Sequence, residues 1–204
     1  MKEKLIVATG NAHKLKEIKE IFPFYEVISQ KEAGFDEDVE ETGTTFEENA
    51  VIKAAAAAKA LGHPTIADDS GICVEALGGA PGIFSARYSG GHGNDKKNRE
   101  KLLRDLLGET NRRAYFKSAV ALCYPSGEKI VVEGRTYGHI LEQEDGEGGF
   151  GYDPLFFSDD LQKSFGRATP EEKNAVSHRY RALQNLLLAL SKRANQTKAK
   201  EEEK

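Results

Sequence analysis

The sequence predicts an α/β fold with a mixed β-sheet. In the first third of the chain, strand-like and helix-like patterns alternate, which is typical of parallel strands joined by helices. Later, two long strand-like runs at residues 113–124 and 129–137 are separated by Pro125–Glu128, a segment that favours a hairpin turn. Because a hairpin joins antiparallel strands, we expect the sheet to contain both strand orientations.

The chain begins with a predicted strand, a tight turn and a helix. Residues 5–8 are uninterrupted apolar residues and predict a buried strand. Thr9-Gly10-Asn11 supplies the turn, and apolar residues then recur at helical spacing from Leu15 to Phe22. A second extended segment at 25–29 leads into an acidic loop at 36–41.

The second predicted helix has clear boundaries. Capping-box patterns begin at Thr44 and at Thr45, each with a glutamate three residues later. Residues 54–58 are alanines, which have the highest helix propensity, and Gly62 is a helix-ending residue.

Strand, loop and helix signals continue to the end of the chain. We expect a single domain at residues 1–194 and a charged, disordered tail at residues 195–204. The remaining predicted elements are strands at 65–67 and 72–74, a glycine-rich loop at 78–94, a charged helix at 95–107, a second glycine-rich loop at 145–151, a short strand at 155–157 and a last helix that begins near Ser177.

The composition limits the classes of function. The chain has 204 residues and a net charge of −4, which disfavours a general nucleic-acid binder. Cys73 and Cys123 are too few for a disulfide framework or a cysteine zinc site and suit a reducing compartment. No targeting segment precedes the first strand, and no run approaches ~18 apolar residues. We therefore expect a cytoplasmic protein with neither a membrane nor a nucleic acid as its partner.

The turn after the first strand predicts an anion site. Unpaired N–H groups at a helix N-terminus attract anions. Lys14 lies in the first helical turn, where a cation is unfavourable unless an anion binds nearby. The alternative is a polar helix cap with a solvated lysine.

Two adjacent aspartates, Asp68 and Asp69, follow a predicted strand and indicate a metal or acid–base site. Neighbouring carboxylates repel unless a cation or hydrogen-bond donors compensate, and Mg²⁺ prefers carboxylate oxygens. Glu40 and Glu41 of the acidic loop are candidates to complete the site. The alternative is an Asx-type turn with solvated acids.

The second helix carries a polar pair on an otherwise apolar face. Asn49 and Lys53 are four residues apart and therefore side by side. A lysine in such surroundings is more often snorkelling than functional. Beside a phosphate, its charge would have a chemical role.

Two later segments predict contacts to a flat ligand. Glycines on both sides of Phe150 allow such a ligand to approach the ring closely, and Asp153 is a candidate acceptor for N–H groups of a base. Ser177 would cap the last helix, whose first turn holds His178 and Arg179. Cations there should face an electron-rich group such as a carbonyl or phosphate. The alternative for Phe150 is a core residue.

Seven motifs, in order from about residue 4 to residue 190, together resemble the inosine triphosphate pyrophosphatase family, in its bacterial branch of non-canonical purine NTP pyrophosphatases. Only the chain after Arg193 lies outside this resemblance. The motifs are Thr9-Gly10-Asn11-x-x-Lys14, Thr45-Phe46-x-Glu48-Asn49-Ala50-x-x-Lys53-Ala54, Ile66-Ala67-Asp68-Asp69-Ser70-Gly71, Leu77-Gly78-Gly79-Ala80-Pro81-Gly82, Ser85-Ala86-Arg87-Tyr88, Gly149-Phe150-Gly151-Tyr152-Asp153-Pro154 and Ser177-His178-Arg179.

The resemblance implies a Mg²⁺-dependent hydrolase, usually a homodimer, that converts ITP, dITP and XTP to the monophosphate and pyrophosphate. It implies an elongated, two-lobed α/β structure whose long twisted mixed sheet is flanked by helices, with the active-site cleft between the lobes.

The resemblance also assigns roles to residues. It implies that Asp69 accepts the proton of the attacking water and binds Mg²⁺. Glu40 is the expected second Mg²⁺ ligand, and Glu41 is the alternative to it. Lys53 and Asp68 would support the charge at the reaction centre. The residues implied to hold the nucleotide are Thr9, Gly10, Asn11, Ala12, His13, Lys14, Ser70, Phe150, Gly151, Tyr152, Asp153, Lys173, His178 and Arg179.

Two alternative functions remain open at this point. A Maf-type pyrophosphatase would act on pyrimidine or modified nucleotides, and the pair His178 and Arg179 favours purines over that reading. A non-catalytic nucleotide- or RNA-binding module would use the arginines between residues 99 and 113 as a basic face. Those arginines alternate with acidic residues, which is typical of a solvated surface.

Overall fold

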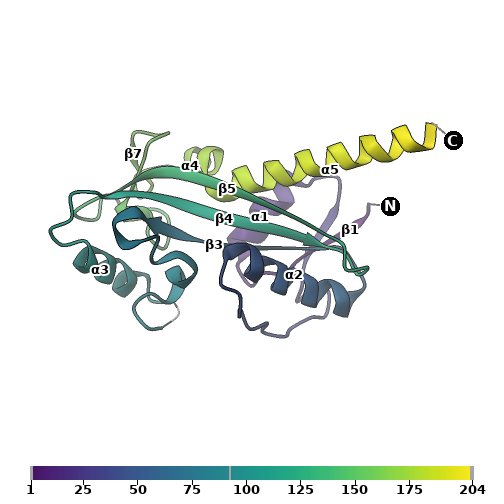
Figure 1. The fold of residues 1–204 in the computed structure, drawn as a ribbon, viewed down its shortest axis with the longest axis horizontal. Helices are drawn as coiled ribbons and strands as arrows, with labels where there is room; N and C mark the ends of the chain where they lie inside the picture. The colour runs from purple at the N-terminus through teal and green to yellow at the C-terminus, as the bar shows by residue number, and fades with distance from the viewer. Residues whose placement is uncertain (1, 92, 203–204) are drawn as a thin grey trace. The chain divides into compact units, whose positions relative to one another are not determined.

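The computed structural model describes residues 2–91 and 93–202, which form two compact units (Figure 1). Unit 1 contains residues 2–69, 119–133 and 181–202, and unit 2 contains residues 70–118 and 134–180. In the described residues, no helix is both long enough and apolar enough to cross a membrane.

Seven strands form one sheet in the order β2-β1-β3-β4-β5-β6-β7. Strand β1 is parallel to β2 and β3, whereas β6 is antiparallel to β5 and β7, so the predicted mixed sheet is confirmed. Residues 124–128 join β4 to its neighbour β5 as the predicted hairpin connection. The strands are β1 (Lys4–Val7), β2 (Glu26–Ser29), β3 (Thr65–Val74), β4 (Arg113–Cys123), β5 (Lys129–Ile140), β6 (Phe156–Ser158) and β7 (Lys163–Ser164).

Helices flank this sheet, and the local signals place their ends. The Thr45 side chain accepts a hydrogen bond from Glu48 N at the start of α2, and Gly62 ends the helix in a left-handed conformation, as predicted. The helices are α1 (Ala12–Ile21), α2 (Phe46–Leu61), α3 (Asp95–Asp105), α4 (Pro170–Val176) and α5 (His178–Glu202), with short 3₁₀ turns η1 (Glu75–Leu77), η2 (Gly82–Arg87) and η3 (Asp153–Leu155).

The core of unit 1 packs strand residues against α1 and α5. Ile18 of α1, Phe22 directly after that helix, and Leu183 and Leu186 of α5 are almost completely buried with Ile66 of β3. Burying one such side chain contributes roughly 1.5–3 kcal/mol. The apolar stripe that the sequence shows on each helix is therefore the surface that holds unit 1 together.

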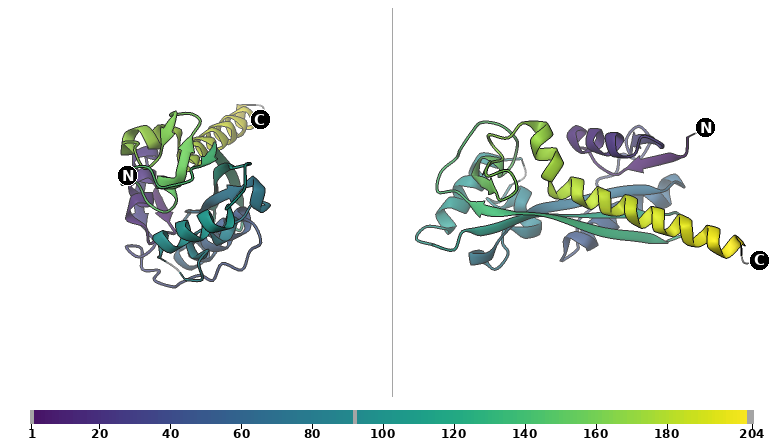
Figure 2. Two further views of the ribbon diagram at one scale, coloured as in Figure 1. Left: turned by 90° about the vertical axis from the view of Figure 1, so that its left-hand side faces the viewer. Right: turned by 90° about the horizontal axis from the view of Figure 1, so that it is seen from above.

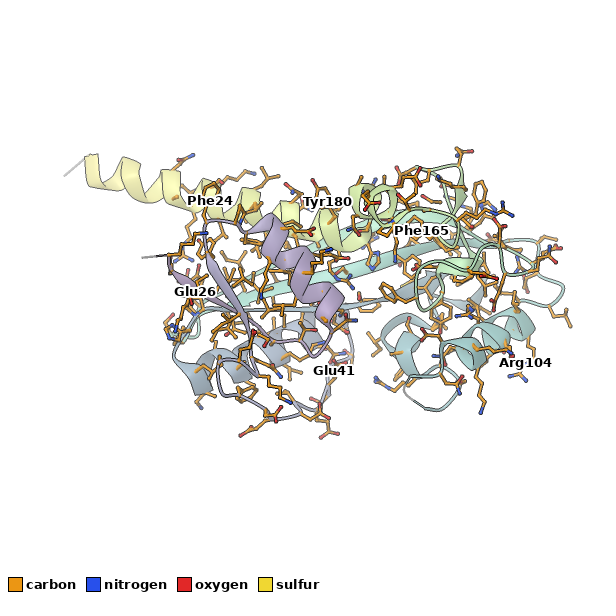
Figure 3. The ribbon with its side chains drawn as sticks, turned by 180° about the vertical axis from the view of Figure 1, so that it is seen from behind. Phe24, Glu26, Glu41, Arg104, Phe165 and Tyr180 are labelled. Carbon is orange, nitrogen blue, oxygen red and sulfur yellow. The ribbon has the colours of Figure 1, made fainter. Side chains whose placement is uncertain are left out.

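The core of unit 2 is built around three phenylalanine rings. Phe116 lies edge-to-face on Phe156 with ring centroids 4.8 Å apart, and Phe165 lies 5.0 Å from Phe156. Leu102 and Leu106 bury the inner face of the α3 segment against this cluster. Phe165 is labelled in Figure 3.

Two helical regions differ from the sequence expectations. Helix α4 was not predicted, although Thr169 and Glu172 form a capping box and Pro170 occupies the first turn. Helix α5 continues to Glu202 and so includes residues 195–202, which the sequence predicted as a charged tail (Figure 2). Residues 197–202 are mostly Lys, Ala and Glu, which have high helix propensity. Residues 203 and 204 lie outside the described residues.

Candidate active site

The β1–α1 turn in unit 1 brings Lys14 to a buried carboxylate. Asn11 caps α1, because its side-chain oxygen accepts from Lys14 N. The Lys14 Nζ lies 2.9 Å from Asp68 Oδ2, and the Asp68 side chain is only 2% exposed. The Asp68 carboxylate is thus an anion beside the lysine in the first turn of α1. Lys14 keeps 19% of its side chain exposed, so an added anion can still approach it.

The second acidic centre of unit 1 surrounds Lys53 of α2. Lys53 Nζ donates to Glu41 Oε1 at 2.7 Å and to the Asp68 carbonyl oxygen at 2.9 Å. It also lies 3.6 Å from Asp69 Oδ1. Asn49, one turn earlier on α2, donates from Nδ2 to Asp69 Oδ2 at 3.2 Å. Asp69 is therefore fixed by two side chains of one helix face.

Asp69 is poised to take up a proton. Burial raises the pKa of Asp69, Lys53 opposes this rise, and the nearby Glu41 charge reinforces it. Burial by itself would lower the pKa of Lys53, but the charges of Asp69 and Asp68 raise it, so Lys53 stays protonated. A carboxylate with a raised pKa beside a permanent cation is an arrangement typical of a general base.

Two acidic residues of unit 1 are chemically suited to bind a hard divalent cation. In the parts of the chain that the structure describes, no three His, Cys, Asp or Glu residues gather in a group that could hold a metal ion. Asp69 and Glu41, however, both approach Lys53 Nζ and share its charge. Glu41 is labelled in Figure 3. Mg²⁺ is commonly held by one or two carboxylates together with substrate phosphates and water, so these two residues suffice.

Unit 2 presents Phe150 on a tightly held loop. The ring is 48% exposed, whereas its backbone N–H donates to Asp153 Oδ2 at 2.8 Å. Gly149 has φ +77°, and a Cβ at this position would collide with the Asp153 side chain. The glycine before Phe150 is therefore required by the close approach of Asp153, which the sequence could not show. Tyr152 is buried, and its hydroxyl donates to the Ser85 carbonyl at 2.8 Å.

A cationic group in unit 2 lies beside this loop. Lys173 Nζ contacts Asp153 Oδ2 at 2.5 Å and lies 4.1 Å from the centroid of the Phe150 ring. Ser177 Oγ accepts from Tyr180 N and so caps α5, as predicted. His178 stacks on Phe116 with centroids 5.0 Å apart, and Arg179 Nη2 lies 3.5 Å from Ser70 Oγ.

The sequence as a whole matches one known family. A model of the Ham1 family matches residues 5–189, which is most of the chain. The chain belongs to the Ham1 family. This match confirms the resemblance that the seven motifs carry.

Named relatives and solved structures of Ham1 proteins agree with this assignment. The chain is 51% identical over 194 residues to a dITP/XTP pyrophosphatase of Clostridium perfringens, covering 90% of this chain and 95% of the relative. It is 49% identical over 190 residues to a dITP/XTP pyrophosphatase of Bacillus subtilis, covering 91% and 96%. The Staphylococcus aureus Ham1 protein structure has a TM-score of 0.88 at 45% identity and covers 94% of this chain and 100% of that one.

The structure distributes the expected site residues of this Ham1 chain over both units. Unit 1 gathers Lys14, Lys53, Asp68 and Asp69, while Thr9, Gly10, Asn11 and Ala12 form the adjacent turn and cap. Unit 2 gathers Phe150, Gly151, Asp153 and Lys173 in one place and brings Arg179 to Ser70. Within β3, Asp69 is the last residue of unit 1 and Ser70 the first of unit 2.

Some expected residues in the Ham1 chain have other surroundings, and one residue was missed. Glu40 is exposed, whereas Glu41, named as the alternative ligand, forms the ion pair with Lys53. Tyr152 packs in the core instead of facing a ligand. The His13 side chain lies outside the described residues. Asn49 was not expected to hold Asp69, although its spacing from Lys53 is the signal that would have identified it.

Proposed function

We propose that this chain hydrolyses the non-canonical purine triphosphates dITP, XTP and ITP to the monophosphate and pyrophosphate. The names of the relatives support this substrate class, and the paired carboxylate–lysine contacts of unit 1 support this chemistry. Neither the family nor the named relatives support the Maf-type alternative. The single observation that carries the proposal is Asp69, a partly buried carboxylate of raised pKa that contacts Asn49 and Lys53.

In the proposed reaction, Asp69 removes a proton from the attacking water. The water oxygen bonds to the α-phosphorus, and the oxygen that bridges the α- and β-phosphorus atoms leaves with pyrophosphate. Lys53 and Lys14 stabilise the charge that develops on the phosphate oxygens, because fixed cations at that place need no rearrangement during the reaction. Asp68 holds Lys14 in position through its 2.9 Å contact.

We propose Mg²⁺ as the cofactor, with Asp69 and Glu41 as its protein ligands. The ion would neutralise phosphate oxygens and fix the orientation of the triphosphate. The chemistry of two nearby carboxylates supports this choice, and Glu41 replaces Glu40 because Glu41 is the acid that approaches Lys53. The charge of Lys53 offsets part of the repulsion between these two carboxylates.

The polar residues of unit 2 are proposed to bind the purine. The exposed Phe150 ring would stack on the base, and Lys173 and Asp153 would hold the Phe150 loop in place. His178 and Arg179 would donate to the 6-keto oxygen of hypoxanthine or xanthine. Adenine has an amino group at that position and would leave these buried donors unpaired, which disfavours ATP.

A pyrophosphate-release assay tests the proposed function. Purified protein is incubated with Mg²⁺ and a panel of ITP, dITP, XTP, ATP and pyrimidine triphosphates, and pyrophosphate is distinguished from orthophosphate. Chelation by EDTA should abolish release from dITP, and added Mg²⁺ should restore it. Release of orthophosphate alone, or preference for pyrimidine triphosphates, would contradict the proposal.

Asp69→Asn is the decisive variant for the role of Asp69. We expect kcat to fall by at least ~10²–10³, while dITP binding measured by calorimetry is largely retained. Because the folded-state pKa of Asp69 is raised, its ionised form lowers stability near neutral pH, and the variant should unfold at no lower temperature than the wild type. Asp38→Asn, in an exposed part of the acidic loop, is the matched control and should keep full activity. An active Asp69→Asn enzyme would overturn the assignment.

A homodimer and a cytoplasmic location complete the proposal. The homodimer was expected from the family resemblance, and the cytoplasmic location from the composition and the two cysteines. Light scattering coupled to size-exclusion chromatography tests the assembly, and a mass corresponding to one chain would contradict it.

A further inference from the structure

Helix α3 binds the loop that carries Phe150. Asp95 Oδ2 accepts a hydrogen bond from Gly151 N at 2.8 Å, and Arg99 Nη1 donates to the Gly151 carbonyl oxygen, also at 2.8 Å. Asp95 and Arg99 are four residues apart, so they lie side by side on one helix face. This pair, which we call the α3 clamp, therefore satisfies both backbone polar groups of the residue next to Phe150.

The α3 clamp is itself firmly anchored in unit 2. Arg99 Nε donates to Glu144 Oε1 at 2.8 Å, and only 14% of the Arg99 side chain is exposed. Asn98, between the two clamp residues, accepts from Ser89 N and donates to the Ala86 carbonyl. The inner face of α3 buries Leu102 in the phenylalanine core. A helix held by these contacts provides a fixed support for a loop.

The α3 clamp and Asp153 bind neighbouring polar groups of the same backbone segment. Asp153 fixes the Phe150 N–H, while the clamp fixes the Gly151 N–H and C=O. The Phe150 ring nevertheless remains about half exposed. These hydrogen bonds restrict the backbone that carries the exposed ring before any ligand arrives, which favours binding by preorganisation.

We propose that Asp95 and Arg99 are positioning residues that set the Phe150 ring for stacking on the substrate base. This inference rests on the proposed function, since it requires Phe150 to contact the purine. The clamp residues touch no reacting atom in this scheme. They should therefore affect the recognition of the base, expressed in KM, and leave the chemistry of the triphosphate, expressed in kcat, nearly unchanged.

Three variants of unit 2 test the α3 clamp. Asp95→Ala removes the acceptor for Gly151 N, whereas Asp95→Asn keeps an acceptor oxygen at the same place. Lys101→Ala is the matched control on the same helix, because Lys101 pairs with Asp105 and makes no contact to Gly151 in the described structure. Loss of a hydrogen bond to a charged group predicts about a tenfold higher KM for dITP in Asp95→Ala, with kcat within about twofold. Asp95→Asn should recover most of the loss.

Two further measurements separate positioning from a merely structural effect. Hydrolysis of ribose 5-triphosphate, which lacks a base, should be unchanged in Asp95→Ala. In a double-mutant cycle with Phe150→Ala, the Asp95→Ala substitution should raise KM no further, because the ring it positions is gone. Hydrogen exchange of residues 148–153 without nucleotide should be faster in Asp95→Ala than in Lys101→Ala.

The outcomes distinguish the α3 clamp from the proposed function. The clamp would be overturned if Asp95→Ala impaired hydrolysis of dITP and of ribose 5-triphosphate equally. It would also be overturned if Asp95→Ala and Phe150→Ala raised KM independently, so that their effects multiplied. In both cases, pyrophosphate release by the wild type would still support the proposed function. Unchanged KM and exchange in Asp95→Ala would overturn the clamp as well. A wild-type protein that releases no pyrophosphate from dITP would overturn the proposed function and, with it, the role of the clamp.

Discussion

Replacing Lys53 by methionine removes the cation that joins the acidic residues of unit 1 and nearly preserves side-chain volume. Lys53 donates to Glu41 and to the Asp68 carbonyl, and it lies 3.6 Å from Asp69 Oδ1. In the variant, Glu41 and the Asp68 carbonyl lose the hydrogen bonds that Lys53 donates. The negative charge that develops on the phosphate during the reaction also loses the positive charge of Lys53. We expect both the rate and its pH dependence to change.

The contact distance sets the size of the expected effect. At 3.6 Å and an effective dielectric constant of ~20, a pair of unit charges attracts by about 4–5 kcal/mol before desolvation and screening are counted. Loss of one preorganised group commonly costs ~10²–10³ in kcat, about 2.7–4 kcal/mol. A developing phosphate charge at a similar distance from Lys53 would gain an attraction of the same size, which is large enough to account for such a loss. We therefore expect kcat for dITP to fall about 10²–10³-fold in Lys53→Met.

The pH profile shows how Lys53 acts. Lys53 opposes the burial that raises the pKa of Asp69, so its removal lets that pKa rise further and moves the acid limb of activity to higher pH. If Lys53 only kept Asp69 ionised, alkaline pH would restore full kcat. A direct role on the phosphate predicts a loss that persists at high pH.

The assay compares kcat for dITP between pH 5 and pH 10 in wild type, Lys53→Met and Lys59→Met. Lys59 lies on the same helix and is exposed, so it is the matched control. Circular dichroism and thermal unfolding establish that each variant is folded. A Lys53→Met enzyme within threefold of the wild type at every pH, or an equal loss in Lys59→Met, would refute the reasoning.

Three further predictions concern pH, backbone packing and substrate choice. Burial raises the pKa of Asp69, so wild-type kcat/KM should fall at acidic pH with an apparent pKa above ~3.9, the value of an exposed aspartate. An apparent pKa below that value would contradict the role of Asp69 as base. Gly71→Ala should lower the free energy of unfolding in urea by about 1–3 kcal/mol, since the new Cβ would collide with the Gly82 carbonyl and Ser85 Oγ; unchanged stability would mean that this turn moves aside. Steady-state kinetics should give kcat/KM for ATP about 10⁴-fold below that for dITP, whereas values within tenfold would refute base reading by buried donors.

Local signals in the sequence predicted the elements well, because such signals act over a few residues. Thr45 and Gly62 were identified as the ends of α2, and both have the expected capping geometry. The alternation of helices and strands followed by a hairpin also predicted a mixed sheet correctly. The helix at 170–176 was missed even though Thr169 and Pro170 signal its start, since its seven residues show no apolar periodicity.

The partners of the acidic residues depend on contacts between distant parts of the chain. The sequence left Glu40 and Glu41 as alternatives, and the path of the loop before α2 brings Glu41 to Lys53, 12 residues away. Lys14 reaches Asp68 because β1 pairs with β3 in the sheet. No spacing rule relates such residues, because the strand order that makes them neighbours is a property of the whole fold.

The sequence by itself determined the family, the type of fold and the kinds of side chain available for phosphate and base. Tertiary structure decided which of those side chains meet. Arg99 illustrates the difference, because its alternation with acidic residues suggested a solvated surface, whereas its guanidinium binds the carbonyl of Gly151, 52 residues away. Periodicity and capping are encoded within a turn or two of helix, but the environment of a charge is set by whatever the folded chain packs around it.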